Sequence, residues 1–105
     1  MDKEINAIEA AKLLKEAESV LLDVREPDEL EICSILGAHH IPMTEIPERI
    51  AEIPKDIPLV VFCHHGMRSM KVLQYLAERG YDRVLNLKGG IDAWALSVDK
   101  KMRRY

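Results

Sequence analysis

No apolar run in the sequence approaches the ~20 residues that a helix needs to cross a bilayer. The charged residues 1–4 also lack the apolar stretch of a secretory signal. The formal net charge is −3, so we expect no general attraction to nucleic acid or to a membrane surface, and any anion must bind at a local site. Repeats and low-complexity segments are absent as well, and 105 residues fit one small domain.

Cysteine is scarce: the chain has two, Cys33 and Cys63, in unlike sequence contexts. They do not form the spaced set of a disulfide-stapled secreted domain, so the cytoplasm is the expected compartment. The histidines come as adjacent pairs, 39–40 and 64–65, and neighbours in sequence usually point in different directions. Because no short-spaced set of cysteines and histidines predicts a zinc site, we expect neither a metal nor a cofactor.

Short apolar runs along the chain predict strands at 20–24, 38–41, 58–63 and 83–87. Helical spacing predicts helices at 5–17 with Asn6 as N-cap, at 44–50 with Thr44 as N-cap, at 69–79 and at 91–96, and Pro27 marks the start of a shorter one. This alternation predicts an α/β fold with a parallel sheet between helices, in which ligands bind at the carboxyl ends of the strands. Residues 1–99 would form the domain and 100–105 a basic, mobile tail.

Reactive side chains follow the most apolar strand directly. Residues 62–69 read FCHHGMRS, and Cys63 stands where the strand ends and a loop begins. Such a loop, next to a helix N-terminus, can turn successive backbone amides inward and bind an anion. The same field favours a thiolate, the reactive form of cysteine. We therefore predict Cys63 as the nucleophile, Gly66 as the residue that relaxes a tight loop, and Arg68 as a fixed charge for an oxyanion.

The other residues of this loop carry weaker predictions. Ser69 is expected to cap the helix or to donate to a bound anion. His64 and His65 are ambiguous, because loop histidines are more often solvated or bonded to backbone than in contact with substrate. Most free cysteines are buried and inert, but polar residues, a glycine and an arginine follow Cys63 at once, which favours a functional thiol.

Three segments resemble signatures of the rhodanese family, in the family's order. They are 22–29 (LDVREPDE), 62–69 (FCHHGMRS) and 87–94 (LKGGIDAW), with Gly37-Ala38 and Ile41-Pro42 between the first two. One such motif alone would be weak evidence for the family, but three in the family's order, spanning nearly the whole chain, are strong evidence. The resemblance implies a rhodanese-like three-layer sandwich, in which a five-stranded parallel sheet has helices on both faces.

The resemblance also implies a sulfurtransferase of the thiosulfate:cyanide type. Cys63 would take a sulfur atom from thiosulfate or a persulfide, hold it as a persulfide and pass it to a thiol or cyanide, with ping-pong kinetics. Asp23 and Arg25 would brace the loop, and Gly89-Gly90 would form a turn beside a packed Trp94. The substrate would be bound by loop residues, mainly through their backbone N–H groups: His64, His65, Gly66, Met67, Arg68 and Ser69.

Residues 33–38 depart from the family pattern. They read CSILGA, where the family often shows Gly-His-Ile-Pro-Gly-Ala, so the histidine of that motif is missing and Cys33 replaces a glycine. We expect Cys33 to be a small buried filler, with a second, resolving thiol as the alternative.

Three other functions remain open. Cysteine phosphatases and arsenate reductases use a similar loop, but with one residue more than the four, His64 to Met67, that separate Cys63 from Arg68 here. The tighter loop favours a terminal sulfur over a phosphate group. A non-catalytic interaction module would commonly lack the cysteine or the intact loop. The third is a persulfide relay subunit, which takes sulfur from a protein donor for a sulfur carrier or for tRNA or cofactor thiolation. The loop 63–69 and residues 94–99 resemble rhodanese domains attached to enzymes of sulfur-carrier activation.

Overall fold

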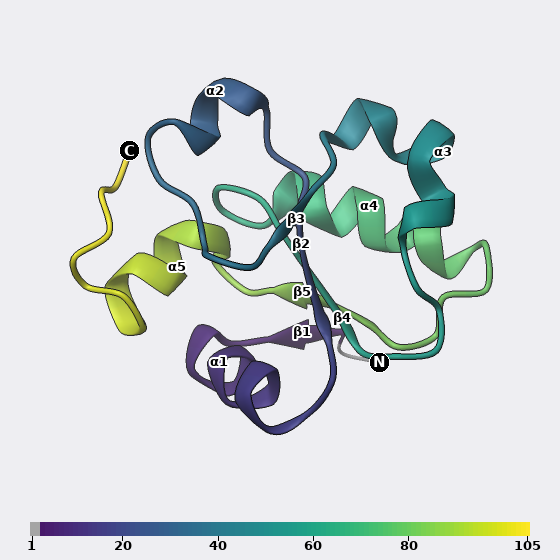
Figure 1. The fold of residues 1–105 in the computed structure, drawn as a ribbon, viewed down its shortest axis with the longest axis horizontal. Helices are drawn as coiled ribbons and strands as arrows, with labels where there is room; N and C mark the ends of the chain where they lie inside the picture. The colour runs from purple at the N-terminus through teal and green to yellow at the C-terminus, as the bar shows by residue number, and fades with distance from the viewer. Residues whose placement is uncertain (1–2) are drawn as a thin grey trace.

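The computed structural model describes residues 3–105 and contains a five-stranded, fully parallel sheet (Figure 1). Its strands are β1 (Glu4–Ile5), β2 (Val20–Asp23), β3 (His39–His40), β4 (Leu59–Phe62) and β5 (Val84–Leu87), in the order β1-β5-β4-β2-β3. The four strands that the apolar runs predict are present. The fifth, β1, pairs only with β5, and residue 5 had been assigned to the following helix instead.

Helices cover both faces of the sheet (Figure 1). They are α1 (Ala7–Glu16), α2 (Pro27–Leu30), α3 (Ile46–Arg49), α4 (Met67–Ala77) and α5 (Gly90–Ser97), with 3-10 turns η1 (Met43–Glu45) and η2 (Ile50–Glu52) around α3. Helices α3 and α4 pack on one face of the sheet, and α1 and α5 on the other. The expected three-layer α/β sandwich is confirmed.

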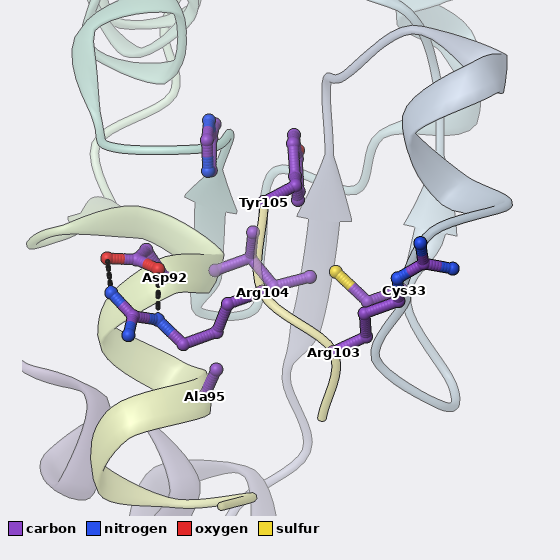
Figure 2. Close-up of a pocket in the computed structure, with 8 residues that line it drawn as sticks. Cys33, Asp92, Ala95, Arg103, Arg104 and Tyr105 are labelled. Atoms are coloured by element: carbon purple, nitrogen blue, oxygen red, sulfur yellow. Dashed lines mark hydrogen bonds and ion pairs between the residues drawn. The ribbon is translucent and has the colours of Figure 1, made fainter. Parts of the chain in front are cut away.

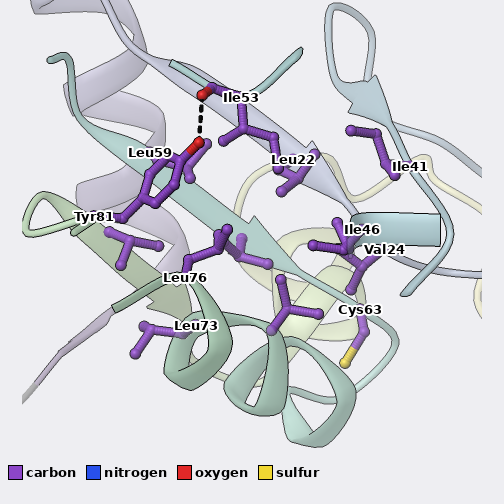
Figure 3. Close-up of a cluster of buried hydrophobic side chains, with 13 residues drawn as sticks. Leu22, Val24, Ile41, Ile46, Ile53, Leu59, Cys63, Leu73, Leu76 and Tyr81 are labelled. Atoms are coloured by element: carbon purple, nitrogen blue, oxygen red, sulfur yellow. Dashed lines mark hydrogen bonds between the residues drawn. The ribbon is translucent and has the colours of Figure 1, made fainter. Parts of the chain in front are cut away.

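Alternation along the central strands divides the core in two, because successive side chains of a strand point to opposite faces. Val61 and Leu22 pack against α3 and α4, whereas Val60 and Phe62 pack against α1 and α5. Both central strands are buried on two sides, as expected for a parallel sheet between helices. Figure 3 shows the first of these clusters, with Cys63 at its end, where β4 runs into the loop.

Helix starts follow the sequence at Asn6 and at Pro27, where α2 begins, and differ elsewhere. The Asn6 side chain accepts a hydrogen bond from Glu9 N at 2.8 Å, so the predicted N-cap is confirmed. Thr44 lies inside η1, and α3 begins only at Ile46, because the chain first makes a tighter turn after Pro42; the predicted cap at Thr44 is therefore wrong. Helix α4 begins at Met67, with Gly66 as its N-cap, two residues earlier than expected.

Residues 100–105 lie against the domain instead of extending freely from it (Figure 1). Arg104 Nε donates to Asp92 at 2.8 Å, and Tyr105 packs on the loop that follows β4. The expected boundary after residue 99 stays a prediction. Within residues 3–105, no helix has the length and apolarity that a membrane span requires.

Candidate active site

Cys63 lies at the carboxyl end of the central strand β4, beside the end of β2, where Asp23 pairs in register with Phe62. Parallel sheets bind ligands at this edge, because the loops that leave the strands gather there. The residue itself is only 2% exposed, while His65 and Met67, further along the loop, are exposed. The thiol therefore sits at the bottom of the loop that surrounds it.

Backbone amides of this loop point at the sulfur. Gly66 N lies 3.1 Å and Ser69 N lies 3.4 Å from Cys63 Sγ, and the Ser69 hydroxyl lies 3.4 Å away. Burial alone raises the pKa of Cys63, but bonds from the Ser69 hydroxyl and amide and from the Gly66 and Arg68 amides outweigh it, so the pKa falls below its ordinary value. Of the amides predicted to face inward, those of Gly66, Arg68 and Ser69 point at the sulfur, and they favour the thiolate.

The start of α5 holds the other side of the loop. Ile91 N donates to the carbonyl oxygen of Cys63 at 2.9 Å, and Asp92 N donates to that of His64 at 3.2 Å. Gly90 makes this approach possible, because it has a φ of +62° and a Cβ there would overlap the carbonyl groups of Cys63 and His64. The sequence predicts a turn at Gly89-Gly90, but it does not show that this turn supports the loop.

Asn86, inside β5, is a site residue that the sequence reasoning missed. It is 1% exposed, its Oδ1 accepts from the Ser69 hydroxyl at 2.5 Å, and its Nδ2 donates to the carbonyl oxygen of Gly66 at 3.2 Å. The single Ser69 proton serves either Asn86 or the Cys63 sulfur at one time. The sequence did contain a signal: Asn86 is a polar residue within an otherwise apolar strand. A buried side-chain amide needs hydrogen-bond partners, which here belong to the active-site loop.

Arg68 is held by a carboxylate that the chain itself provides. Its two terminal nitrogens donate to Glu29 Oε2 and Oε1 at 2.7 and 2.9 Å. This bidentate pair lowers the pKa of Glu29 to about 2 and raises that of Arg68. The direct contact with substrate predicted for Arg68 stays a prediction, since its guanidinium group is occupied by Glu29.

Tyr105 covers His64, the residue that follows Cys63. Its ring stacks on His64 with 3.8 Å between centroids and 4° between planes, and His65 lies on that imidazole too, 3.9 Å away. Burial and the neighbouring His65 lower the pKa of His64, which favours its neutral form. Figure 2 shows Tyr105 and Arg104 beside α5, with Cys33 across from them; these residues and His64 line a narrow surface depression.

Asp23 and Arg25 form a fully buried ion pair, with 2.8 Å between Oδ2 and Nη2. Arg25 also donates to the Cys33 carbonyl oxygen at 2.9 Å and to the Tyr105 hydroxyl at 3.0 Å. The pair thus ties the segment after α2 to the tail. The predicted bracing of the loop by Asp23 and Arg25 stays a prediction; Arg25 contacts Tyr105 and Glu29, which in turn contact His64 and Arg68. Cys33 is half-buried and packs on the α1–α5 core, as a small filler would.

Comparisons with known proteins agree with this geometry. The sequence profile of the Rhodanese-like domain family matches residues 6–97. A protein of Allochromatium vinosum named sulfurtransferase is 46% identical, over 90% of both chains. The thiosulfate sulfurtransferase GlpE of Coxiella burnetii is 37% identical, over 90% of this chain and 88% of its own.

Solved structures show the same fold. The rhodanese-like domain protein of Staphylococcus aureus matches with a TM-score of 0.83 and 32% identity, over 98% of both chains. A rhodanese-related protein of Thermoplasma volcanium also gives 0.83, at 32% identity, over 91% of this chain and 93% of its own. The family profile and these relatives agree with the thiol and the amides around it. The chain therefore belongs to the rhodanese-like domain family and is an enzyme of the sulfurtransferase class.

Proposed function

We propose that this protein moves sulfane sulfur from a donor such as thiosulfate to a thiophilic acceptor through a persulfide on Cys63. The observation that carries the proposal is the geometry at Sγ: two amides and a hydroxyl lie within 3.4 Å of it. These neutral hydrogen-bond donors stabilise negative charge on the sulfur, so no positively charged side chain has to contact it. The same donors remain close to the outer sulfur of a persulfide, which carries the charge after transfer.

The reaction is a double displacement. In the first half, the Cys63 thiolate attacks the outer sulfur of thiosulfate; an S–S bond forms to Sγ, the S–S bond of thiosulfate breaks, and sulfite leaves with its electron pair. In the second half, cyanide or a thiolate attacks the outer sulfur of the persulfide. Thiocyanate or a new persulfide then leaves, and the Cys63 thiolate is restored. Charge is conserved in each half, and no oxidant or reductant is consumed.

The experiment is an intact-mass measurement after incubation with thiosulfate. We expect the protein to gain the mass of one sulfur atom and to lose it when cyanide is added, with thiocyanate released. Cys63→Ser should show no gain, whereas Cys33→Ser, the matched control with one thiol removed elsewhere, should gain sulfur normally. Absence of the gain in the unaltered protein, or its loss in Cys33→Ser, would contradict the proposal.

A persulfide relay for sulfur-carrier, tRNA or cofactor thiolation is the second candidate function. Met67 is 79% exposed beside the buried thiol, which suits contact with a protein that delivers or receives sulfur. A cysteine desulfurase loaded with sulfur would then label Cys63 faster than free thiosulfate does. We also place the protein in the cytoplasm, because Cys33 and Cys63 are both free thiols and the reaction requires one of them to stay reduced.

A further inference from the structure

Glu29, on α2, is a carboxylate beside the active-site loop whose two oxygens are both fully engaged. Its two carboxylate oxygens accept four hydrogen bonds: two from Arg68 at 2.7 and 2.9 Å, one from the Tyr105 hydroxyl at 2.7 Å and one from Glu26 N at 2.9 Å. Its side chain is 15% exposed and that of Arg68 is 33% exposed. A carboxylate with this many donors does not release its arginine readily.

The pair removes a positive charge from the surroundings of the thiol. Bonds from Arg68 lower the pKa of Glu29 to about 2, so the carboxylate is ionised throughout the physiological range. The Cys63 thiolate adds to the raised pKa of Arg68, so the two charges do interact. Asp23 cancels Arg25 in the same way. With Arg25 and Arg68 paired in this way, the groups that face the sulfur itself are the loop amides and the Ser69 hydroxyl.

We propose that Glu29 is a specificity-determining residue, which occupies and neutralises Arg68 and so disfavours doubly charged sulfur donors relative to singly charged ones. The physical reason is that a guanidinium fork would stabilise the second negative charge of a dianionic sulfonate-type group, and Glu29 already fills that fork. The preferred class of donor is then a persulfide of a thiol, small or protein-borne, and not a dianion. This inference rests on the sulfur-transfer function proposed above.

Two donors that differ by one charge test it directly. Thiosulfate is a dianion, and methanethiosulfonate replaces one of its oxyanion oxygens with a methyl group. In both, the Cys63 thiolate attacks the outer sulfur, the donor's S–S bond breaks, and sulfite or methanesulfinate leaves with the electron pair. In a ping-pong reaction, kcat/KM for the donor reports only this half. The ratio of kcat/KM for thiosulfate to that for methanethiosulfonate therefore measures the preference for the extra charge.

Glu29→Gln keeps the shape of the side chain and removes its charge. We expect this variant to raise the ratio about tenfold, the factor that one added charge-assisted contact supplies. Glu31→Gln is the matched control, since it makes the same change in net charge on an exposed side chain two residues away, and it should leave the ratio unchanged. Adding Arg68→Ala to Glu29→Gln should abolish the gain. All rates are compared at one ionic strength.

An unchanged ratio in Glu29→Gln, or a gain that persists without Arg68, would overturn the inference. The unaltered protein gives a second measurement that needs no variant: added salt should not lower kcat/KM for thiosulfate, because salt also screens the repulsion between the dianion and the Cys63 thiolate, and a marked fall would mean that Arg68 is open to it. If neither donor loads sulfur on Cys63, the proposed function fails; if both do and the ratio does not respond, only this inference fails.

Discussion

Replacing Gly90 by alanine should weaken both the fold and the active site. Gly90 begins α5 with a φ of +62°, a conformation that costs an L-residue about 1–2 kcal/mol. The added methyl group also overlaps the carbonyl groups of Cys63 and His64. These carbonyls cannot simply withdraw, because they accept hydrogen bonds from Ile91 and Asp92 at 2.9 and 3.2 Å.

The magnitude follows from two contributions. Overpacking of one methyl group against fixed neighbours costs about 1–3 kcal/mol. Adding the conformational cost, less the several tenths of a kcal/mol by which alanine restricts the unfolded chain, gives a loss of about 2–4 kcal/mol. A domain of this size has roughly 5–15 kcal/mol in total, so the variant should still fold at room temperature but melt many degrees earlier.

Urea denaturation followed by fluorescence of Trp94, the single tryptophan, measures this loss. Gly37→Ala is the control: Gly37 also has a positive φ, +89°, but no atom lies within 4 Å of an added Cβ. It should lose only the conformational part, about 1 kcal/mol, and keep its sulfur-transfer rate. Equal losses of stability in Gly90→Ala and Gly37→Ala, or an unchanged transfer rate in Gly90→Ala, would refute the proposed support of the loop by α5.

Two further predictions concern the contacts of Glu29. Bonds from Arg68 lower its folded-state pKa to about 2 from an ordinary 4.5, so the stabilisation is complete above pH 4.5 and is lost as the pH falls toward 2. Free energies of unfolding between pH 5 and pH 2 should therefore fall less steeply in Glu29→Gln than in Glu31→Gln, by about 2 kcal/mol over that range. Tyr105→Phe keeps the ring but loses the hydroxyl's side-chain hydrogen bonds, and it should lower the free energy of unfolding by about 1 kcal/mol. Tyr75→Phe, which loses a comparable hydroxyl on α4, is its control, and an equal effect of both would count against the role of Tyr105.

Local signals in the sequence predict the strand that ends at Cys63. An apolar, β-branched run stops at Cys63, and polar residues with a glycine follow, so β4, the loop and α4 are all expected at close to their true positions. Strand β1 has only two residues and no periodicity of its own. It exists because Glu4 pairs with Asn86 across the whole chain, which a local pattern does not reveal.

Local sequence patterns also do not reveal which residues contact the active-site loop, because those residues lie far away along the chain. Arg68 and Glu29 are separated by 39 residues, and Tyr105 and Glu29 by 76. In sequence, Arg68 looks like a free cation beside a thiol, and Tyr105 like part of a solvated basic tail. Both interpretations change once the fold places α2 and the tail next to the loop. An arginine near an anion-binding loop is therefore weak grounds for substrate contact until its carboxylate partners are known.

The thiol and the helix behind it stabilise each other. The first amides of a helix have no acceptor within the helix, and those that point into a protein need one from elsewhere. Ser69 N, in the first turn of α4, finds it in Cys63 Sγ at 3.4 Å, and Gly66 N, at the N-cap, finds it there too at 3.1 Å. A thiolate is a stronger acceptor for these amides than a thiol. The arrangement that activates the sulfur therefore also caps α4, and Cys63→Ala should leave these two amides without their acceptor while the apolar core around β4 remains intact.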